Sequence, residues 1–265
     1  MAQTNRPDAW NPRQYGRFHA ERSQPFYDLL DLVRARPGMR VVDVGCGTGQ
    51  LTAEMHRRLE ARETIGVDSS AAMVAEAAAN AGGGFRVVHS DLRAFAEQPE
   101  NQGAFDLVLS NAALQWVPEQ AAVIVRLVGL LARGGQIAIQ VPSNEDHASH
   151  QLARDLAGTE PFRTALDGYV RRHSNLALDE YAELLDRLGF AEQHVRQQVY
   201  VHHLPGREDV VEWVRGTMLT DYQRRMPPEL FDEFLTRYRA GLMPKLSEVR
   251  PFLYPFKRIL VWGSR

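Results

Sequence analysis

The sequence has little of several features that mark common protein classes. Its 265 residues include a single cysteine, so no internal disulfide can form. No uninterrupted apolar stretch approaches the roughly 18 residues of a transmembrane helix, and no basic segment followed by an apolar run marks a leader. The 31 basic residues nearly balance the 33 acidic ones, which leaves no strong positive field to hold a nucleic acid. We therefore expect a cytoplasmic protein that binds neither nucleic acid nor membrane.

Short motifs for several chemistries are also absent. The chain contains neither the dinucleotide-binding motif G-x-G-x-x-G nor the phosphate loop G-x-x-x-x-G-K-[ST]. His147 and His150 are spaced H-x-x-H, but the zinc motif H-E-x-x-H is missing and only one cysteine is available. The sequence therefore predicts no metal site and does not favour a pyrophosphate ligand.

What the sequence does contain is an alternation of short β-branched runs with longer helical segments. This alternation is typical of an α/β fold with a doubly wound, mostly parallel sheet. Strands are predicted at 39–44, 64–67, 85–89, 105–109, 136–141, 195–203 and 258–262. Helices are predicted at 24–35, 50–61, 70–81, 118–131, 178–188, 209–218 and 228–242.

A glycine loop follows the first predicted strand, with Gly45, Gly47 and Gly49 at alternate positions. Glycine permits positive φ and lets a ligand approach the backbone, and the following helix offers unpaired N–H groups. Asp68 ends the second strand, where a carboxylate can accept both hydroxyls of a ribose. Together with Asp43 and Asp91 at the same edge, it suits a positively charged nucleoside better than an anionic nucleotide.

This pattern resembles the class I S-adenosylmethionine-dependent methyltransferases, whose first motif is apolar-acidic-apolar-Gly-x-Gly-x-Gly. The resemblance covers residues 39–141 and implies a Rossmann-like fold with a seven-stranded sheet and S-adenosylmethionine as the methyl donor. It also implies a set of cofactor-binding residues. These are Asp43, Gly45, Gly47, Gly49, Asp68, Ser69, Met73, Asp91, Leu92 and Asn111.

The resemblance gives these residues distinct roles. The glycines would line the methionine moiety and Asp68 would bind the ribose. Met73 would pack near the adenine, Asp91 and Leu92 would reach its edge, and Asn111 would lie beside the sulfonium. Two of them also have plain structural explanations, since aspartate often caps helices and methionine often fills the core.

Further segments resemble the trans-aconitate 2-methyltransferase family over nearly the full chain, including 10–15, 68–73, 114–118, 140–144 and 254–258. The resemblance implies a small polycarboxylic acid as acceptor. A carboxylate is already ionised near pH 7, so it requires no general base. Substrate-binding residues would be Tyr15, Arg22, Gln115, Trp116, Tyr254, Lys257 and Arg258, with Tyr15, Arg22 and Trp116 positioning the acceptor. The whole chain, 1–265, would form one methyltransferase domain in which 1–36 and 204–254 cap the acceptor pocket.

One departure from that family concerns the acceptor. Where an Arg-Pro pair is expected, the chain has Thr220-Asp221, which removes a cation and adds an anion. Other acceptors therefore stay open: a malonyl-carrier carboxyl, or a secondary-metabolite hydroxyl or nitrogen with His19 or His173 as base. DNA adenine and glutamine are disfavoured because the Asn/Asp-Pro-Pro-aromatic signature is absent from 110–118. A non-catalytic module that only binds S-adenosylmethionine is the third possibility.

Overall fold

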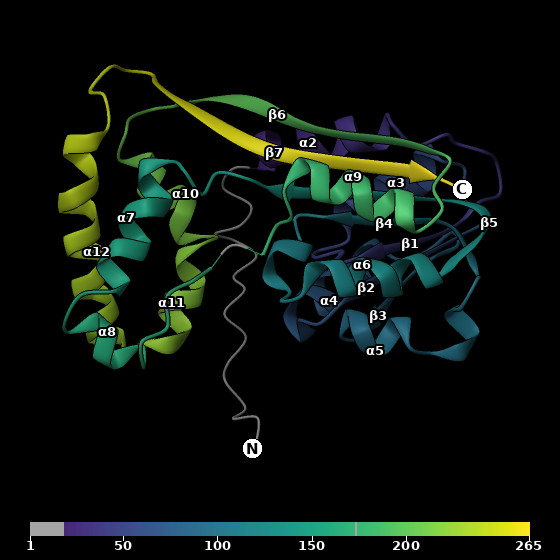
Figure 1. Ribbon diagram of the computed structural model, residues 1–265, viewed down its shortest axis with the longest axis horizontal. Coiled ribbons are helices and arrows are strands. Elements are labelled where there is room, and N and C mark those ends of the chain that lie inside the picture. The colour runs from purple at the N-terminus through teal and green to yellow at the C-terminus, as the bar shows by residue number, and fades with distance from the viewer. Residues whose placement is uncertain (1–18, 173) are drawn as a thin grey trace. The chain divides into compact units, whose positions relative to one another are not determined.

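The computed structural model describes residues 19–172 and 174–265, with side chains from residue 23 onward (Figure 1). The chain divides into two compact units. We call the unit that contains residues 20–143, 174–198 and 257–265 the sheet unit. The described part of the other, the helical unit, comprises residues 144–172 and 199–256. In the described ranges, every helix is too short or too polar to cross a lipid bilayer.

The sheet has seven strands in the order β3-β2-β1-β4-β5-β7-β6. Their bounds are β1 Arg40–Val44, β2 Glu63–Asp68, β3 Phe85–His89, β4 Phe105–Asn111, β5 Leu131–Pro142, β6 Glu192–Leu204 and β7 Phe252–Ser264. The strands from β3 through β5 pair in parallel, whereas β7 runs antiparallel to β5. The predicted doubly wound, mostly parallel sheet is confirmed.

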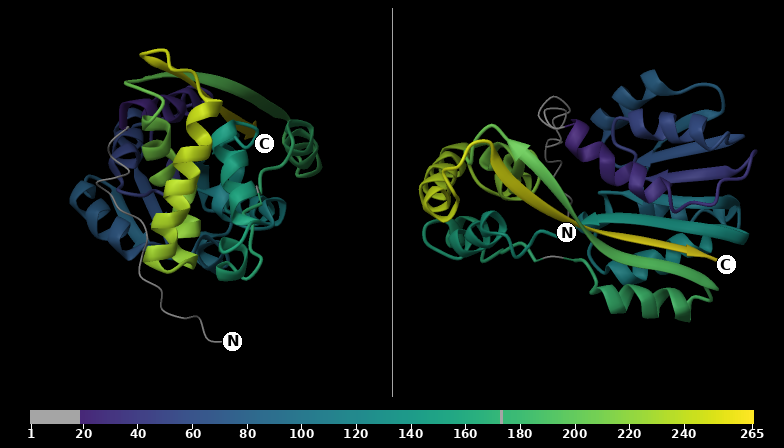
Figure 2. Two further views of the ribbon diagram at one scale, coloured as in Figure 1. Left: turned by 90° about the vertical axis from the view of Figure 1, so that its left-hand side faces the viewer. Right: turned by 90° about the horizontal axis from the view of Figure 1, so that it is seen from above.

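Helices cover both faces of the sheet (Figure 2). Those of the sheet unit are α2 His19–Leu30, α3 Gln50–Arg58, α4 Ala71–Ala77, α5 Leu92–Ala96, α6 Gln120–Gly129 and α9 Leu178–Arg187. Val42 and Val44 of β1 lie in the core cluster with α5, α6 and α9. Asp43 lies between them and so points to the opposite face, where Thr52 of α3 contacts it.

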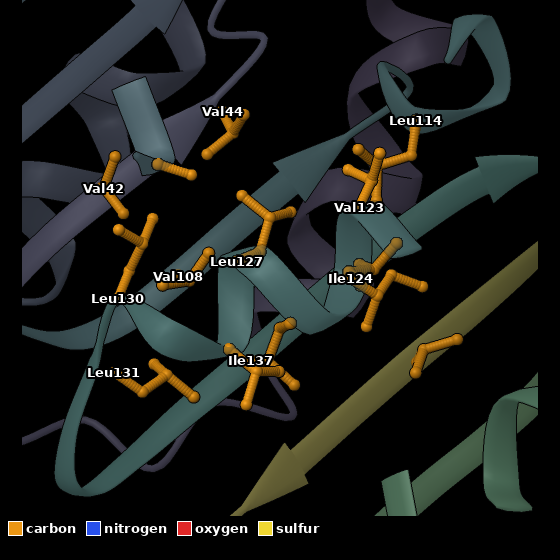
Figure 3. Close-up of a cluster of buried hydrophobic side chains, with 14 of the residues drawn as sticks. Val42, Val44, Val108, Leu114, Val123, Ile124, Leu127, Leu130, Leu131 and Ile137 are labelled. Atoms are coloured by element: carbon orange, nitrogen blue, oxygen red, sulfur yellow. The ribbon is translucent and has the colours of Figure 1, made fainter. Parts of the chain in front are cut away.

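The core beneath α6 shows how the sequence pattern produces this packing. Val123, Ile124 and Leu127 recur at helical spacing, so they lie on one face of α6. They are buried in one cluster with Val108 of β4 and Ile137 of β5 (Figure 3). Truncating a buried leucine to alanine costs about 2–5 kcal/mol, so this cluster is a major source of stability.

Aromatic side chains form the core of the helical unit. The described part of this unit contains five α-helices (Figure 1). They are α7 Ala148–Ala157, α8 Phe162–Ala165, α10 Asp209–Arg215, α11 Leu219–Arg225 and α12 Pro228–Leu242. Trp213, Tyr222, Phe234 and Tyr238 are nearly inaccessible to solvent in this core. Only α10 and α12 were expected from the sequence. The predicted helix 209–218 was too long, because α10 ends at Arg215 and Gly216 caps it.

Candidate active site

The loop between β1 and α3 holds its glycines in the left-handed backbone region, with φ of 83° at Gly45, 56° at Gly47 and 72° at Gly49. A Cβ on Gly45 would lie 2.2 Å from Cβ of Ala113, and one on Gly49 would lie 2.9 Å from Cβ of Ala77. Those two glycines therefore allow close packing. A Cβ on Gly47 would meet nothing within 4 Å, so the middle of the loop leaves room for a ligand to approach the backbone.

Asp68 ties this loop to the end of β2. Its Oδ2 accepts a hydrogen bond from the backbone N–H of Gly47 at 2.9 Å, and its Oδ1 accepts one from Ser70 N–H at 2.8 Å. Each carboxylate oxygen can accept more than one hydrogen bond, so these contacts do not prevent Asp68 from accepting ribose hydroxyls. The position of Asp68 at a strand's carboxyl end fits the predicted role.

Asp43 lies directly before the loop and is 3% exposed. Its Oδ2 accepts a hydrogen bond from the Thr52 hydroxyl at 2.5 Å, and its Oδ1 has no hydrogen-bond partner among the described residues. Burial raises the pKa of Asp43 to about 7; the Thr52 bond opposes this shift and the charge of Asp68 adds to it. Asp43 therefore joins β1 to α3 and keeps one acceptor oxygen unused beside the loop.

The residues predicted around the adenine lie at the starts of α4 and α5. The Ser70 hydroxyl caps α4 by accepting from Met73 N–H at 3.2 Å, and Met73 is 5% exposed. Ser69, one residue earlier, is exposed. Asp91 caps α5 by accepting from the backbone N–H of its first turn, and Leu92 packs against the core cluster. The capping explanation for Asp91 is confirmed, while its contact with adenine stays a prediction.

Asn111 is the last residue of β4 and pairs in register with Gln140 of β5. Its Oδ1 is buried and has no partner among the described residues. In the turn that follows, the Gln115 amide donates to the Ala112 carbonyl at 2.6 Å, and Trp116 is half-buried. A carbonyl oxygen buried without a partner suits an N–H or positively charged ligand group. The loop, Asp68 and Asn111 thus fit S-adenosylmethionine.

The predicted acceptor residues are divided between the two units. Arg258 of β7 belongs to the sheet unit, is 4% exposed and donates from Nη1 to Oε1 of Gln140 at 3.3 Å. Lys257 is half-buried next to it, and its carbonyl accepts from Ser143 N–H at 2.8 Å. Tyr254 belongs to the helical unit, where its buried ring lies edge-on to His147 with centroids 5.0 Å apart.

Some predicted residues lie outside the part of the chain that the structure describes. Tyr15 and His173 are not among the described residues, and neither are the side chains of Arg22 and His19. Their roles stay predictions. In the two described ranges, no group of three or more histidine, cysteine, aspartate or glutamate side chains could hold a metal ion.

Thr220 and Asp221, which stand where the family resemblance leads us to expect an Arg-Pro pair, both have hydrogen-bond partners nearby. Asp221 accepts a hydrogen bond from the Tyr169 hydroxyl and forms an ion pair with Arg225 at 3.1 Å. The Thr220 hydroxyl donates to the Thr217 carbonyl. Partners inside the helical unit therefore already compensate the negative charge at position 221.

Gln140 is not among the residues predicted for the site, yet its side chain is buried and only partly hydrogen-bonded. A polar side chain within the buried run 136–141 was the available signal, but Gln136 gives the same signal. Only the hydrogen bonds distinguish the two: Gln136 has partners at both ends of its amide, whereas Nε2 of Gln140 has none among the described residues.

Comparisons with known proteins agree with this geometry. Residues 35–175 match a family described as a methyltransferase domain. The chain is 40% identical over 262 residues to a trans-aconitate 2-methyltransferase of Deinococcus radiodurans, covering 97% of this chain and 98% of that protein. It is 37% identical over 260 residues to one from Mycobacterium sp. (strain KMS), covering 95% and 98%.

Solved structures show the same fold at low sequence identity. The YcgJ protein of Bacillus subtilis aligns with a TM-score of 0.59 at 17% identity, covering 91% of this chain and 98% of that one. Phosphoethanolamine N-methyltransferase 2 of Haemonchus contortus, in complex with S-adenosyl-L-methionine, aligns with a TM-score of 0.54 at 16% identity, covering 92% and 52%. The fold, the glycine loop and the full-length relatives agree: this chain is a class I S-adenosylmethionine-dependent methyltransferase and belongs to the trans-aconitate 2-methyltransferase family.

Proposed function

We propose that this methyltransferase transfers the methyl group to a carboxylate of a small polycarboxylic acid, with trans-aconitate as the favoured acceptor. The name shared by its full-length relatives supports this acceptor. The structural observation that carries the proposal is the buried guanidinium of Arg258 on β7, hydrogen-bonded to Gln140 next to Asn111 in the sheet. Arginine suits carboxylates because its planar fork can bind both oxygens.

Methyl transfer to a carboxylate mainly requires the protein to position the two reactants. S-adenosylmethionine supplies, when bound, a methyl group on a positively charged sulfur. The acceptor carboxylate is ionised near pH 7, so no side chain has to remove a proton. Arg258 would fix the acid and the glycine loop with Asp68 would fix the donor. Orienting two reactants in this way can supply roughly 7–11 kcal/mol of the barrier.

Residue 221 does not oppose an anionic acceptor. An unpaired aspartate in the acceptor pocket would repel a polycarboxylate, but Asp221 already has Tyr169 and Arg225 as partners. From the family resemblance we further propose that residues 204–254 act as a cap over the acceptor.

The proposal is tested by methyl transfer from labelled S-adenosylmethionine to a panel of acceptors. The panel contains trans-aconitate, citrate, a monocarboxylate, a malonyl-carrier protein and hydroxyl- and amine-bearing metabolites. We expect label in a base-labile ester of trans-aconitate, with kcat/KM at least roughly tenfold above that for the monocarboxylate. Label that enters only the carrier protein, a hydroxyl or an amine would overturn the proposal. The proposal would also be overturned if the protein binds S-adenosylhomocysteine but transfers the methyl group to none of these acceptors.

A further inference from the structure

We propose that Gln140 binds the acceptor, and that its amide Nε2 together with the Arg258 guanidinium holds one carboxylate of the acid. This inference rests on the proposed function and extends it to a residue that neither the sequence pattern nor the comparisons assign. Gln140 lies on β5 within the sheet unit and is 0% exposed. Its place in the sheet and its hydrogen bonds carry the inference.

The orientation of the Gln140 amide is fixed by its neighbour. Arg258 Nη1 lies 3.3 Å from Oε1 of Gln140. A guanidinium only donates hydrogen bonds, so it must face the oxygen of the amide and not its nitrogen. Nε2 is therefore directed away from that bond as a donor. Gln140 and Arg258 together present N–H groups from two adjacent strands, which suits an anion.

The nitrogen of Gln140 needs a partner that the described residues do not provide. Nε2 is buried and makes no hydrogen bond to them. Leaving a buried donor unsatisfied is unfavourable, so Nε2 of Gln140 requires a hydrogen-bond acceptor such as a ligand oxygen.

Gln136, four residues earlier on the same strand and the same face, shows the alternative. Its Nε2 donates to the Arg34 carbonyl at 2.9 Å, and its Oε1 accepts from Trp262 Nε1 at 3.0 Å. Both ends of that amide are used, so Gln136 holds the fold together. The same residue type in the same strand therefore has two different roles, and only Gln140 keeps a donor for a ligand.

Gln140 lies beside a residue predicted to bind the cofactor. Gln140 pairs in register with Asn111, whose buried Oδ1 is an acceptor without a partner among the described residues. An acceptor atom suits the positively charged end of the cofactor, and a neighbouring donor suits the negatively charged acid. Strand β4 thus offers an acceptor to the cofactor, and the adjacent β5 offers a hydrogen-bond donor to the acid. Both residues lie near the carboxyl ends of their strands, where ligands bind in open α/β sheets.

The test compares Gln140→Met, which keeps a similar volume but has no N–H donor, with the matched variant Gln136→Met. For Gln140→Met we expect KM for trans-aconitate to rise at least roughly tenfold, while the dissociation constant of S-adenosylhomocysteine stays within about twofold of wild type. Gln136→Met should lower the melting temperature and leave KM for the acid unchanged. Gln140→Glu, which puts an anion beside Arg258, should weaken acceptor binding further and leave S-adenosylhomocysteine binding intact.

Two results would overturn the inference. One is an unchanged KM for trans-aconitate in Gln140→Met, which would mean that water or the protein satisfies Nε2. The other is an equal loss of acceptor and S-adenosylhomocysteine binding, which would mean that Gln140 is structural. A wild-type protein that methylates no carboxylate would instead refute the proposed function, so the two failures are distinguishable.

Discussion

At the scale of single residues, Asp68 connects the cofactor loop to the sheet. It accepts backbone hydrogen bonds from Gly47 and Ser70, and its position fits the ribose. Asp68→Ala removes a charged acceptor, so we expect the dissociation constant of S-adenosylhomocysteine to rise at least about tenfold. Isothermal titration calorimetry measures this directly. An affinity within twofold of wild type would show that Asp68 only shapes the loop.

Asp43 makes stability depend on pH. Burial raises its pKa from 3.8 to about 7 in the folded protein. Between about pH 4 and about pH 7 the unfolded chain releases this proton and the folded protein keeps it, so rising pH favours unfolding across that window. At about 1.4 kcal/mol per pKa unit, the loss in the free energy of unfolding reaches about 4 kcal/mol. Above about pH 7 this loss stays constant, because Asp43 is then ionised in both states.

The measurement compares wild type with Asp43→Asn, which cannot ionise, in urea titrations without ligand. The free energy of unfolding of Asp43→Asn minus that of wild type should increase from about pH 4 to about pH 7 and then level off. A difference between the two proteins that is the same at both ends of the window would show that Asp43 does not titrate there.

The role of a residue could be predicted where the residue directly follows a strand that the sequence reveals. The glycine loop and Asp68 follow strands whose β-branched runs are visible in the sequence, so their common edge could be inferred. Gln140 could not be found in this way. Its proposed role depends on its hydrogen bond with Arg258, which lies 118 positions away in the sequence.

At the scale of elements, the β1–α3 loop depends differently on each glycine. Gly45 and Gly47 both have positive φ, so alanine at either site costs about 1–2 kcal/mol of backbone strain. Gly45→Ala adds a clash with Ala113, whereas a methyl group at Gly47 has open space. We expect Gly45→Ala to lower the melting temperature more than Gly47→Ala does.

Gly47→Ala should lower stability less than Gly45→Ala but weaken S-adenosylhomocysteine binding strongly, because its methyl group enters the space left for a ligand. Thermal melts and calorimetry on both variants provide the comparison. Equal melting temperatures, or full affinity in Gly47→Ala, would contradict this division of roles.

The elements themselves were predictable in the sheet and less so in the helical unit. All seven strands were located, although β5, β6 and β7 begin earlier than expected. Helix α2 (His19–Leu30) also starts and ends earlier than the predicted 24–35. Helix α7 was missed because its N-cap is His147, an unusual capping residue, whose ring nitrogen accepts a hydrogen bond from Ser149 N–H. The early start of β5 depends on its pairing with β4 at Phe105 and Leu131, which the sequence does not show.

At the scale of the whole molecule, all predicted cofactor residues lie in the sheet unit, while the predicted acceptor residues come from both units. If residues 204–254 act as the proposed cap, binding of the acid should make the molecule more compact. We expect the radius of gyration from small-angle X-ray scattering to fall when trans-aconitate is added to the S-adenosylhomocysteine complex. S-adenosylhomocysteine alone is the control, and an unchanged radius with both ligands would argue against a closing cap.

The most direct test is a crystal structure with S-adenosylhomocysteine and trans-aconitate bound. The ribose hydroxyls should lie within hydrogen-bond distance of Asp68, and one carboxylate of the acid should contact both Nε2 of Gln140 and the guanidinium of Arg258. A nucleoside bound away from the glycine loop, or an acid held without Arg258 and Gln140, would contradict the carboxyl edge of this sheet as the place where donor and acceptor meet.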